Sequence, residues 1–368
     1  MTAPEAQVRE QILQAAARLT GEGLIERTWG NISARVSDTQ FIITPSGLAY
    51  ETLRPEQLVL VNIADASWEG DIKPSSEKGI HADAYRLRPD VNFVIHTHQY
   101  YASVAGIEGR ALTGFIHPLL GKRVPCAAYG LPGTVRLRQA VEAEETAWPD
   151  CRAFLLRSHG ALCLGRDMED AFAAARALEE VCEARVRDQL GEGKPLPVPP
   201  DLGISVREGD SFRLTRKGRS RRYPIDGAAL PRAAALHAAV YRAGGFQCIA
   251  HETSPETLAV SVLGRRLRPY LDDLAQIAGA DVLCVPAEPG RIEWAVRGRN
   301  AVLVRGMGAL CAGTSESDVE AVRALMAKGC EARLYARAVP GCRPLHPADA
   351  VLQRLIYQRS YKRKKDLC

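Results

Sequence analysis

The chain of 368 residues lacks several features that would assign it to a special class of protein. It has no apolar run near the roughly 20 residues that a membrane-spanning helix needs. Its first residues, MTAPEAQVREQ, are polar and charged, so the hydrophobic region of a secretory signal is absent. We therefore expect a cytoplasmic protein with no membrane partner.

Closely spaced cysteines are also missing, since the ten cysteines stand singly with no C-x-x-C pair. Several lie inside apolar runs, such as Cys163 in GALCLG and Cys284 in VLCVP. Buried reduced thiols pack as small apolar side chains. We therefore expect free thiols rather than disulfides.

Charge of one sign is only slightly in excess, with a formal net charge of +5. Two short basic runs, Arg216 to Arg222 and Lys362 to Lys365, hold much of this excess. Such runs are typical of solvated faces and tails, so we do not expect a nucleic acid as partner. The hydrophobic content of 46% is enough for the cores of two globular domains.

The sequence repeats itself within the chain. Ile80-His-Ala-Asp-Ala-Tyr-Arg86 resembles Leu236-His-Ala-Ala-Val-Tyr-Arg242, and Arg157-Ser-His-Gly-Ala-Leu-Cys163 resembles Arg305-Gly-Met-Gly-Ala-Leu-Cys311. The matches occur in the same order in both halves, which indicates a tandem duplication.

Between the two copies, the stretch GEGKPLPVPPDLG is rich in proline and glycine and predicts a linker. In the stretch that follows, 204–228, alternation around Ser211-Phe-Arg-Leu214 favours a short strand. The predicted parts are a first domain at 1–190, a linker at 191–228, a second domain at 229–340 and a basic tail at 341–368.

The first copy alternates between helical and strand patterns, so its predicted class is α/β. Apolar residues at helical spacing predict a helix over 5–21. Strands are predicted at 31–36, 40–44, 93–97 and 153–157, and further helices from Ser75 or Ser76 to about Arg88 and over 168–189.

Three histidines are candidate metal ligands. His96 and His98 are two apart on a predicted strand, where alternate residues point to the same side. His159 closes a second predicted strand. Three histidines leave a coordination position open, as in a catalytic site, and neutral imidazoles suit Zn²⁺ and also Mn²⁺, Co²⁺ or Fe²⁺. Taken alone, two histidines on a strand are more often residues of a polar surface or of a satisfied core than metal ligands.

The second copy lacks most of these ligands. His96 corresponds to His251, but His98 corresponds to Thr253 and the position of His159 to a methionine. An incomplete set of ligands cannot hold a catalytic ion. We therefore expect the second domain to keep the fold without the metal site.

Five motifs occur in one order: Gly30-Asn-Ile-Ser33, Thr44-Pro-Ser-Gly47, Pro74-Ser-Ser-Glu77, His96-Thr-His98 and Ser158-His-Gly160. Over residues 5–190 this series resembles the class II aldolase/adducin family, and most of all its fuculose-phosphate aldolase branch. Over 229–338 the resemblance rests on the internal repeat. It implies a three-layer αβα fold in two tandem related domains.

The resemblance implies that His96, His98 and His159 bind the metal, with Glu77 beside them as the base or acid on the substrate carbon. Cleaving a bond next to a carbonyl places negative charge on its oxygen, and a divalent ion stabilises this enediolate. A carboxylate beside the ion is placed for proton transfer. The alternative for Glu77 is a glutamate at a helix start, stabilised by the helix dipole.

The family's phosphate-binding motifs match seven residues: Asn31, Ser33, Thr44, Ser46, Gly47, Ser75 and Ser76. Small hydroxyls, a permissive glycine and a helix N-terminus together form a neutral cradle for a phosphate or a carboxylate. Each of these residues alone is as typical of a turn or a cap.

The chain departs from the family in one segment. The branch carries a tyrosine after the His-x-His helix that protonates the leaving aldehyde, whereas Gly114 to Gly121 contains none. His117, Tyr129 and Tyr357 are candidate substitutes, although His117 is more typical of a loop.

The predicted function is therefore a divalent-metal-dependent lyase that cleaves a carbon–carbon bond in a small hydroxy-carbonyl compound bearing a phosphate or carboxylate. The alternatives are a decarboxylase of an oxo or hydroxy acid, an epimerase, a non-heme iron oxygenase and a non-catalytic adducin-like interaction module. Members of the family form rings of four with sites between neighbours. A tandem chain supplies two neighbours, so we expect a homodimer with pseudo-fourfold symmetry.

Overall fold

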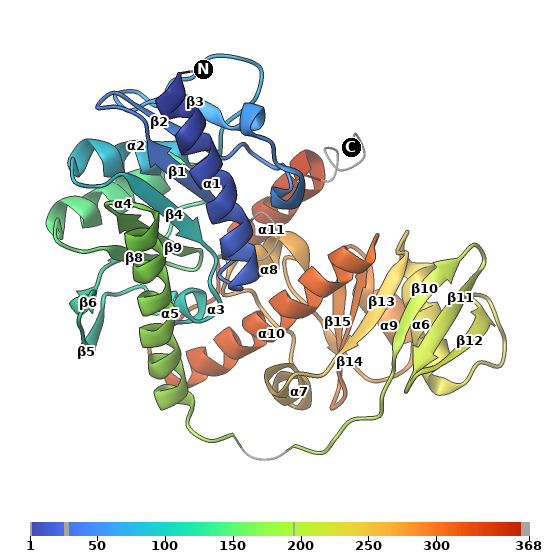
Figure 1. The fold of residues 1–368 in the computed structure, drawn as a ribbon. Helices are drawn as coiled ribbons and strands as arrows, with labels where there is room; N and C mark the ends of the chain where they lie inside the picture. The colour runs from blue at the N-terminus through green and yellow to red at the C-terminus, as the bar shows by residue number, and fades with distance from the viewer. Residues whose placement is uncertain (1, 26–28, 194–195, 362–368) are drawn as a thin grey trace. The chain divides into compact units, whose positions relative to one another are not determined.

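The structure is a computed structural model that describes residues 2–25, 29–193 and 196–361. The chain forms two compact units, residues 1–189 and residues 190–368 (Figure 1). Each unit is built on a seven-stranded mixed sheet with helices on both sides. The fold class is therefore α/β, in two tandem related domains.

The strands of the first unit are β1 (Gly30–Arg35), β2 (Gln40–Ile43), β3 (Val59–Asn62), β4 (Phe93–Thr97), β5 (Leu112–His117), β6 (Gly121–Val124), β7 (Cys126–Ala127), β8 (Ala153–Leu156) and β9 (Gly160–Gly165). Its helices are α1 (Ala3–Gly21), η1 (Tyr50–Thr52), η2 (Pro55–Gln57), α2 (Lys78–Leu87), α3 (Tyr100–Gly106), α4 (Val135–Ala147) and α5 (Met168–Leu190). The sheet order is β3-β2-β1-β4-β9-β8-β7, and β5 and β6 form a separate hairpin.

Two layers of helices enclose the first sheet. On one side lie α1 and α5, which meet where the Arg18 guanidinium stands 4.2 Å from the centre of the Phe172 ring. On the other side α2 and α4 pack in the core that includes Tyr85, Leu137 and Phe154. The predicted helix over 5–21 and the predicted strand over 93–97 are both confirmed.

The start of α2 differs from the prediction. Neither Ser75 nor Ser76 is its N-cap, because the helix begins at Lys78 and Glu77 takes the capping position. Ser75 instead closes the turn before the helix, where its Oγ accepts a hydrogen bond of 3.2 Å from the Glu77 backbone N–H. This turn brings the Glu77 carboxylate beside His96, near the end of β4.

The strands of the second unit are β10 (Ile204–Glu208), β11 (Ser211–Arg216), β12 (Arg219–Pro224), β13 (Cys248–Glu252), β14 (Cys284–Val285), β15 (Ala301–Val304) and β16 (Gly308–Gly313). Its helices are α6 (Arg232–Ala243), α7 (Pro255–Val262), α8 (Asp272–Ile277), α9 (Pro289–Val296), α10 (Glu316–Ala338), α11 (Pro347–Ile356) and the π-helix η3 (Tyr357–Tyr361). The sheet order, β12-β11-β10-β13-β16-β15-β14, repeats that of the first unit.

The segment 191–228, expected to be a linker, holds three strands of the second sheet, β10 to β12. The predicted strand at Ser211 to Leu214 is confirmed as part of β11. The basic run from Arg216 to Arg222 forms the exposed hairpin between β11 and β12. The second basic run, Lys362 to Lys365, lies outside the described residues.

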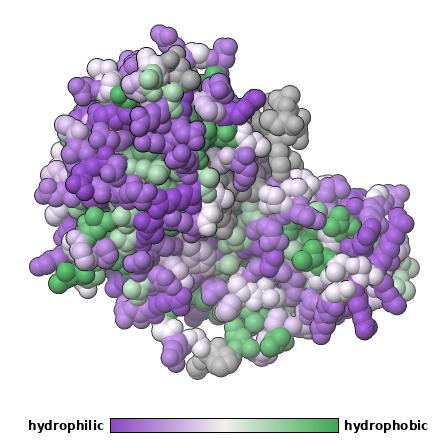
Figure 2. Space-filling view, in the orientation of Figure 1, coloured by the Kyte–Doolittle hydropathy of each residue, from purple (hydrophilic) through white to green (hydrophobic). Residues whose placement is uncertain are grey.

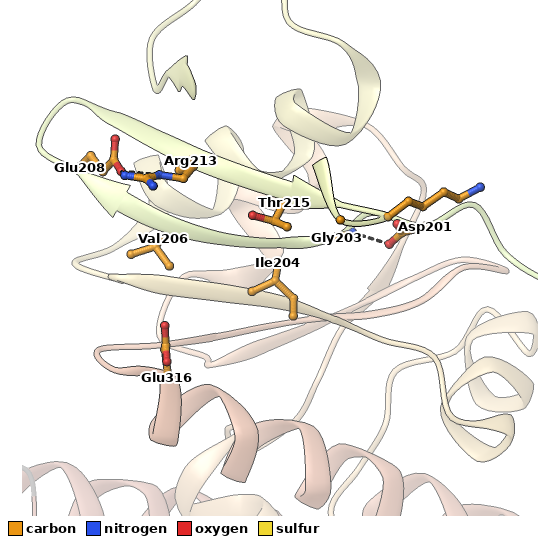
Figure 3. Close-up of a pocket in the computed structure, with 10 residues that line it drawn as sticks. Asp201, Gly203, Ile204, Val206, Glu208, Arg213, Thr215 and Glu316 are labelled. Carbon is orange, nitrogen blue, oxygen red and sulfur yellow. Dashed lines mark hydrogen bonds and ion pairs between the residues drawn. The ribbon is translucent and has the colours of Figure 1, made fainter. Parts of the chain in front are cut away.

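Part of one face of the second sheet, at β10, has no helix over it. In the first unit α1 covers β1, so Ile32 is 0% and Ala34 is 2% exposed. Between α5 and β10 the described residues contain no helix, and the corresponding Ile204 and Val206 are 48% and 38% exposed. They line a groove of about 670 Å³. Figure 3 shows their side chains on this open side, with Glu316 at the start of α10.

The surface and the thiols agree with an ordinary globular chain. Figure 2 shows polar side chains over most of the visible face, with apolar ones in small separate patches. Among the described helices, none has both the length and the apolarity needed to cross a bilayer. Six cysteines are buried as thiols: Cys126, Cys163, Cys182, Cys248, Cys311 and Cys330. Cys284, expected to be buried as Cys163 is, is a free thiol that is only half-buried.

Candidate metal centre

The three candidate histidines come from two neighbouring strands of the first sheet. His96 lies in β4 and His98 directly follows that strand. The structure differs from the prediction for His159, which lies in the tight turn between β8 and β9 rather than at the end of a strand. Because β9 pairs with β4, this turn lies beside the end of β4.

Backbone conformation explains how the turn approaches so closely. Ser158 has a φ of +60°, a left-handed conformation that is uncommon in residues other than glycine. Gly160 stands on the other side of His159, and a Cβ atom there would lie 2.1 Å from the Thr97 carbonyl oxygen. A side chain there would push β9 away from β4 and separate the histidines.

The side-chain nitrogens converge on one point. The His96 Nε2 atom lies 3.2 Å from that of His98 and 3.1 Å from that of His159. The Glu77 carboxylate completes the group, with 3.0 Å from Oε1 to His159 Nε2 and 3.2 Å from Oε2 to His96 Nε2. Among the described residues, no other group of three His, Cys, Asp or Glu side chains brings its ligand atoms this close.

The surroundings of His96 prepare its Nε2 atom to bind an ion. Its Nδ1–H donates a hydrogen bond of 2.9 Å to the Ala161 carbonyl, which leaves the Nε2 lone pair facing the centre. Burial lowers the pKa of His96, although the Glu77 charge opposes this. The ring is therefore neutral at neutral pH, as a metal ligand must be.

The donor set fits a divalent ion. Tetrahedral bonds of about 2.1 Å would place the ligand nitrogens about 3.4 Å apart, close to the separations present here. Three imidazoles without a cation would otherwise face one another in a buried position, since His96 and His159 are each 2% exposed. These residues could thus hold Zn²⁺ or a similar ion, with the carboxylate adjacent.

Glu77 is ionised in this arrangement. Burial opposes its ionisation, but the nearby His96 and His159 and the hydrogen bond from His159 keep the pKa of Glu77 well below its usual range. Asn31 donates a hydrogen bond of 3.0 Å from Nδ2 to Glu77 Oε2. The amide therefore fixes Oε2, while Oε1 faces His159 Nε2 at the centre.

The expected anion-binding residues lie on two segments that run side by side. The Ser75 N–H donates to the Thr44 carbonyl at 3.1 Å, and the Ser46 N–H donates to the Lys73 carbonyl at 3.0 Å. Gly47 has a φ of +75°, which favours glycine at this turn. The structure thus brings residues 44–47 beside residues 73–76.

Two of the expected anion-binding hydroxyls are turned into the fold. Ser33 is 0% exposed, and Thr44, which is 1% exposed, accepts a hydrogen bond of 3.2 Å from the Ile32 backbone N–H. The Ser33 hydroxyl is hydrogen-bonded to the buried side chains of His81 and Tyr85. The open part of the cradle consists of Ser46, Gly47 and Ser76.

A cleft of about 400 Å³ opens at the start of α2. Its lining includes Trp68, Ser76, Glu77, Lys78 and Arg138. The Lys78 ammonium lies 4.7 Å from the centre of the Trp68 ring, and Arg138 is paired with a buried aspartate. Glu77, which is 8% exposed, is among the residues of its wall, and the Lys78 ammonium adds positive charge beside the cradle.

Sequence reasoning missed two residues behind the site, His81 and Tyr85 on α2. They occur in the repeated stretch that has its second copy at Leu236 to Arg242, and this recurrence was the available signal. His117, by contrast, caps its own turn, because its Nδ1 accepts a hydrogen bond of 3.1 Å from the Leu119 N–H.

The second unit contains no comparable group in its described residues. His251, which corresponds to His96, accepts a hydrogen bond of 3.2 Å from the Leu202 N–H at Nδ1. Its Nε2–H donates one of 2.7 Å to the Met307 carbonyl. Both ring nitrogens are engaged with the backbone, so none is available to an ion.

Comparison with known proteins gives a family match in both halves. The profile described as "Class II Aldolase and Adducin N-terminal domain" matches residues 10–186 and again residues 207–333. The 5-methylthioribulose-1-phosphate/5-deoxyribulose-1-phosphate aldolase of Rhodospirillum rubrum is 36% identical over 195 residues, which are 52% of this chain and 86% of that protein.

Two further relatives carry related names. The L-fuculose phosphate aldolase of Escherichia coli is 32% identical over 200 residues, which cover 53% of this chain and 90% of that protein. Among solved structures, an L-fuculose 1-phosphate aldolase matches with a TM-score of 0.46 at 27% identity, covering 54% of this chain and 92% of that one.

Proposed function

Because the chain belongs to the class II aldolase and adducin family, we propose that its first unit is a divalent-metal-dependent aldolase for a small phosphorylated hydroxy-ketone. The single observation that carries this proposal is the convergence of Glu77 with His96 and His159 at 3.0–3.2 Å. The names of the two relatives from Rhodospirillum rubrum and Escherichia coli, both aldolases of sugar phosphates, support the same class of substrate.

The proposed ligands are His96, His98 and His159. A divalent cation bound there would stabilise the negative charge that develops on the substrate carbonyl oxygen during cleavage. Zn²⁺ suits the three imidazoles, and Mn²⁺, Co²⁺ and Fe²⁺ are the other candidates.

Aldol cleavage breaks the bond between the carbon next to the carbonyl and the carbon that bears the hydroxyl group. The hydroxyl loses its proton and becomes an aldehyde, while the electrons of the broken bond remain on the first carbon, which then takes up a proton. We assign both transfers to Glu77, which is ionised and lines the cleft at the start of α2: its carboxylate would first take up the hydroxyl proton and then deliver it to the first carbon. The substrate phosphate would bind to Ser46, Gly47 and Ser76, next to the N-terminus of that helix.

One observation favours a second candidate, a decarboxylase of an oxo or hydroxy acid. The hairpin of β5 and β6 and its turn contain no tyrosine that could help to take the proton from the hydroxyl that becomes the aldehyde, and decarboxylation has no such step. Loss of carbon dioxide also leaves charge on a carbon next to a carbonyl. The same residues would then serve a substrate in which a carboxylate occupies the cradle.

The metal-loaded protein should cleave a ketose 1-phosphate, such as 5-deoxyribulose 1-phosphate or fuculose 1-phosphate, to dihydroxyacetone phosphate and an aldehyde. Glu77→Gln should reduce kcat by about 100-fold or more while the protein keeps its metal. Release of carbon dioxide from oxo acids, with no cleavage of ketose phosphates, would replace the aldolase by the decarboxylase. No turnover of either class by the metal-loaded protein would contradict both.

The second unit is proposed to serve as scaffold rather than as a second catalyst, since its His251 is engaged by the backbone. A cytoplasmic location remains a prediction from the sequence.

A further inference from the structure

A line of buried side chains connects the core of the first unit to Glu77. The Tyr85 hydroxyl lies 2.7 Å from Ser33 Oγ, and Ser33 Oγ lies 2.6 Å from His81 Nδ1. The other ring nitrogen of His81, Nε2, contacts Asn31 Oδ1, and Asn31 Nδ2 lies 3.0 Å from Glu77 Oε2. All five side chains are at most 8% exposed.

The chemistry of these groups fixes the direction of every hydrogen bond. The Glu77 carboxylate only accepts, so Asn31 must donate from its amide nitrogen and accept at its oxygen. The donor to that oxygen is therefore the Nε2–H of His81. Burial lowers the pKa of His81 to about 3, so the ring is neutral and its Nδ1 accepts. Ser33 donates to it, and Tyr85 in turn donates to Ser33.

We propose that His81 is a positioning residue for the reaction, which acts by holding Asn31 in the one amide orientation that donates to Glu77. If the amide turned over, its oxygen would face the Glu77 carboxylate. The Nε2–H of His81 opposes this turn because it would then face the NH₂ group of Asn31, a donor against a donor. The inference rests on the proposed function, since Glu77 is the group whose position matters.

The second unit contains the same trio of side chains without the connection to a carboxylate. Ser205 Oγ lies 2.7 Å from His237 Nδ1 and 2.8 Å from the Tyr241 hydroxyl. The residue before β10 is Gly203, at the position of Asn31, because the Gly203 carbonyl accepts a hydrogen bond of 3.0 Å from the His251 N–H. No side chain extends from there toward His237.

In His81 the Nε2 atom contacts Asn31, and the corresponding Nε2 atom of His237 has no such side chain beside it. His237 is 0% exposed, and its Nε2 atom has no side chain as hydrogen-bond partner among the described residues. The trio is thus part of the architecture of both units. Only the first unit extends it through Asn31 to Glu77, beside the candidate metal ligands.

This difference supplies a matched pair of variants. His81→Asn keeps an acceptor for Ser33 near the position of Nδ1 and removes the donor to Asn31. His237→Asn makes the same change in the second unit, where that donor holds no side chain. His81→Gln carries an amide N–H near the position of Nε2 and should restore the donor. Any loss specific to His81→Asn therefore reports on the bond to Asn31.

The kinetic test uses the metal-loaded full chain. His81→Asn should lower kcat by about 100-fold, the cost of a displacement near 1 Å, with little change in KM or in bound metal. His81→Gln should recover most of this loss, and His237→Asn should keep the wild-type kcat. Equal kcat values for His81→Asn and His237→Asn would overturn the proposal.

A double variant tests whether His81 acts through Asn31. Asn31→Gly reproduces the arrangement of the second unit, which folds with glycine at that position. The double variant with His81→Asn should lose no more activity than Asn31→Gly alone, because the path is already broken. Losses that multiply in the double variant would show that His81 acts independently, which would contradict the proposal.

A measurement without turnover separates this inference from the proposed function. Exchange of the Asn31 side-chain amide protons with solvent, followed by NMR, should be slow in the wild type, in His81→Gln and in His237→Asn, and faster in His81→Asn. Unchanged exchange in His81→Asn would overturn the positioning role even in an active enzyme. The expected pattern in a protein that cleaves no ketose phosphate would support the positioning of Asn31 and reject only the aldolase.

Discussion

Single ring nitrogens distinguish the two halves of this chain. His96 gives Nδ1 to the Ala161 carbonyl and keeps Nε2 for the centre, whereas His251 gives both nitrogens to backbone groups. The residue type is the same at both positions, and the sheet register is equivalent. What differs is the partner of Nε2, which is a shared centre in one unit and the Met307 carbonyl in the other.

Another single residue predicts how stability depends on pH. Glu145 on α4 is 1% exposed, and neither of its carboxylate oxygens has a hydrogen-bond partner among the described residues. Burial raises its pKa from 4.5 to about 8, and the charge of Asp83 adds to this shift. The folded protein therefore holds a proton that the unfolded chain releases, so stability should fall as the pH rises from about 4.5 to 8.

Glu145→Gln should remove this dependence, because the amide is neutral at every pH. The variant should unfold several degrees above the wild type at pH 8 and close to it at pH 5, measured by thermal unfolding followed by circular dichroism. Glu10→Gln, an exposed change on α1, serves as the control. The same difference between Glu145→Gln and wild type at both pH values would contradict the assignment.

The roles of the site residues were only partly predictable from the sequence. The motif order identified the three histidines and Glu77, because each motif is local. Ser33 was expected in the anion cradle, and the structure instead turns its hydroxyl toward His81 and Tyr85. Alternation along a strand predicts the side of the sheet to which a side chain points, but not the side chains with which it forms hydrogen bonds.

At the scale of elements, the turn between β8 and β9 carries the close approach that the site needs. Gly160→Ala would place a Cβ atom 2.1 Å from the Thr97 carbonyl oxygen, and Gly308→Ala in the second unit would place one 2.3 Å from that of Glu252. We expect both changes to lower stability by about 1–3 kcal/mol. Only Gly160→Ala should also displace His159 and weaken metal binding, by about tenfold or more.

Stability is measured by chemical denaturation, and metal affinity by competition with a chromogenic chelator. Equal metal affinities in Gly160→Ala and Gly308→Ala would show that the turn does not position His159.

Elements with a strong apolar pattern were predicted from the sequence, and those with a weak pattern were not. The strand at Phe93–Thr97 is buried along its whole length, and its apolar run marks it clearly. In the hairpin of β11 and β12, arginines from Arg216 to Arg222 fill an exposed edge strand. Such a strand shows no apolar alternation, so a linker was predicted where the second sheet has its edge.

At the scale of the whole molecule, the second unit repeats the sheet of the first without its leading helix. Ile204 and Val206 are exposed where α1 protects Ile32 and Ala34 in the first unit. The repeated strand order and the doubled family match agree on the tandem arrangement. The sequence predicted the tandem from short matching motifs, but it could not show which face loses its cover.

The tandem chain should assemble as a homodimer, because two chains would supply the four related domains of a ring. Size-exclusion chromatography with light scattering at micromolar concentration should give twice the mass of one chain. A mass of one chain under these conditions would contradict the pseudo-fourfold assembly.

The central claim is that the first unit holds one catalytic divalent ion on His96, His98 and His159. The most direct measurement is the metal content of the purified protein, of His98→Ala and of His251→Ala, after loading with Zn²⁺ and removal of the excess. We expect one ion per chain in the wild type and in His251→Ala, and loss of the ion in His98→Ala. Equal metal content in the two variants, or no retained metal in the wild type, would contradict it.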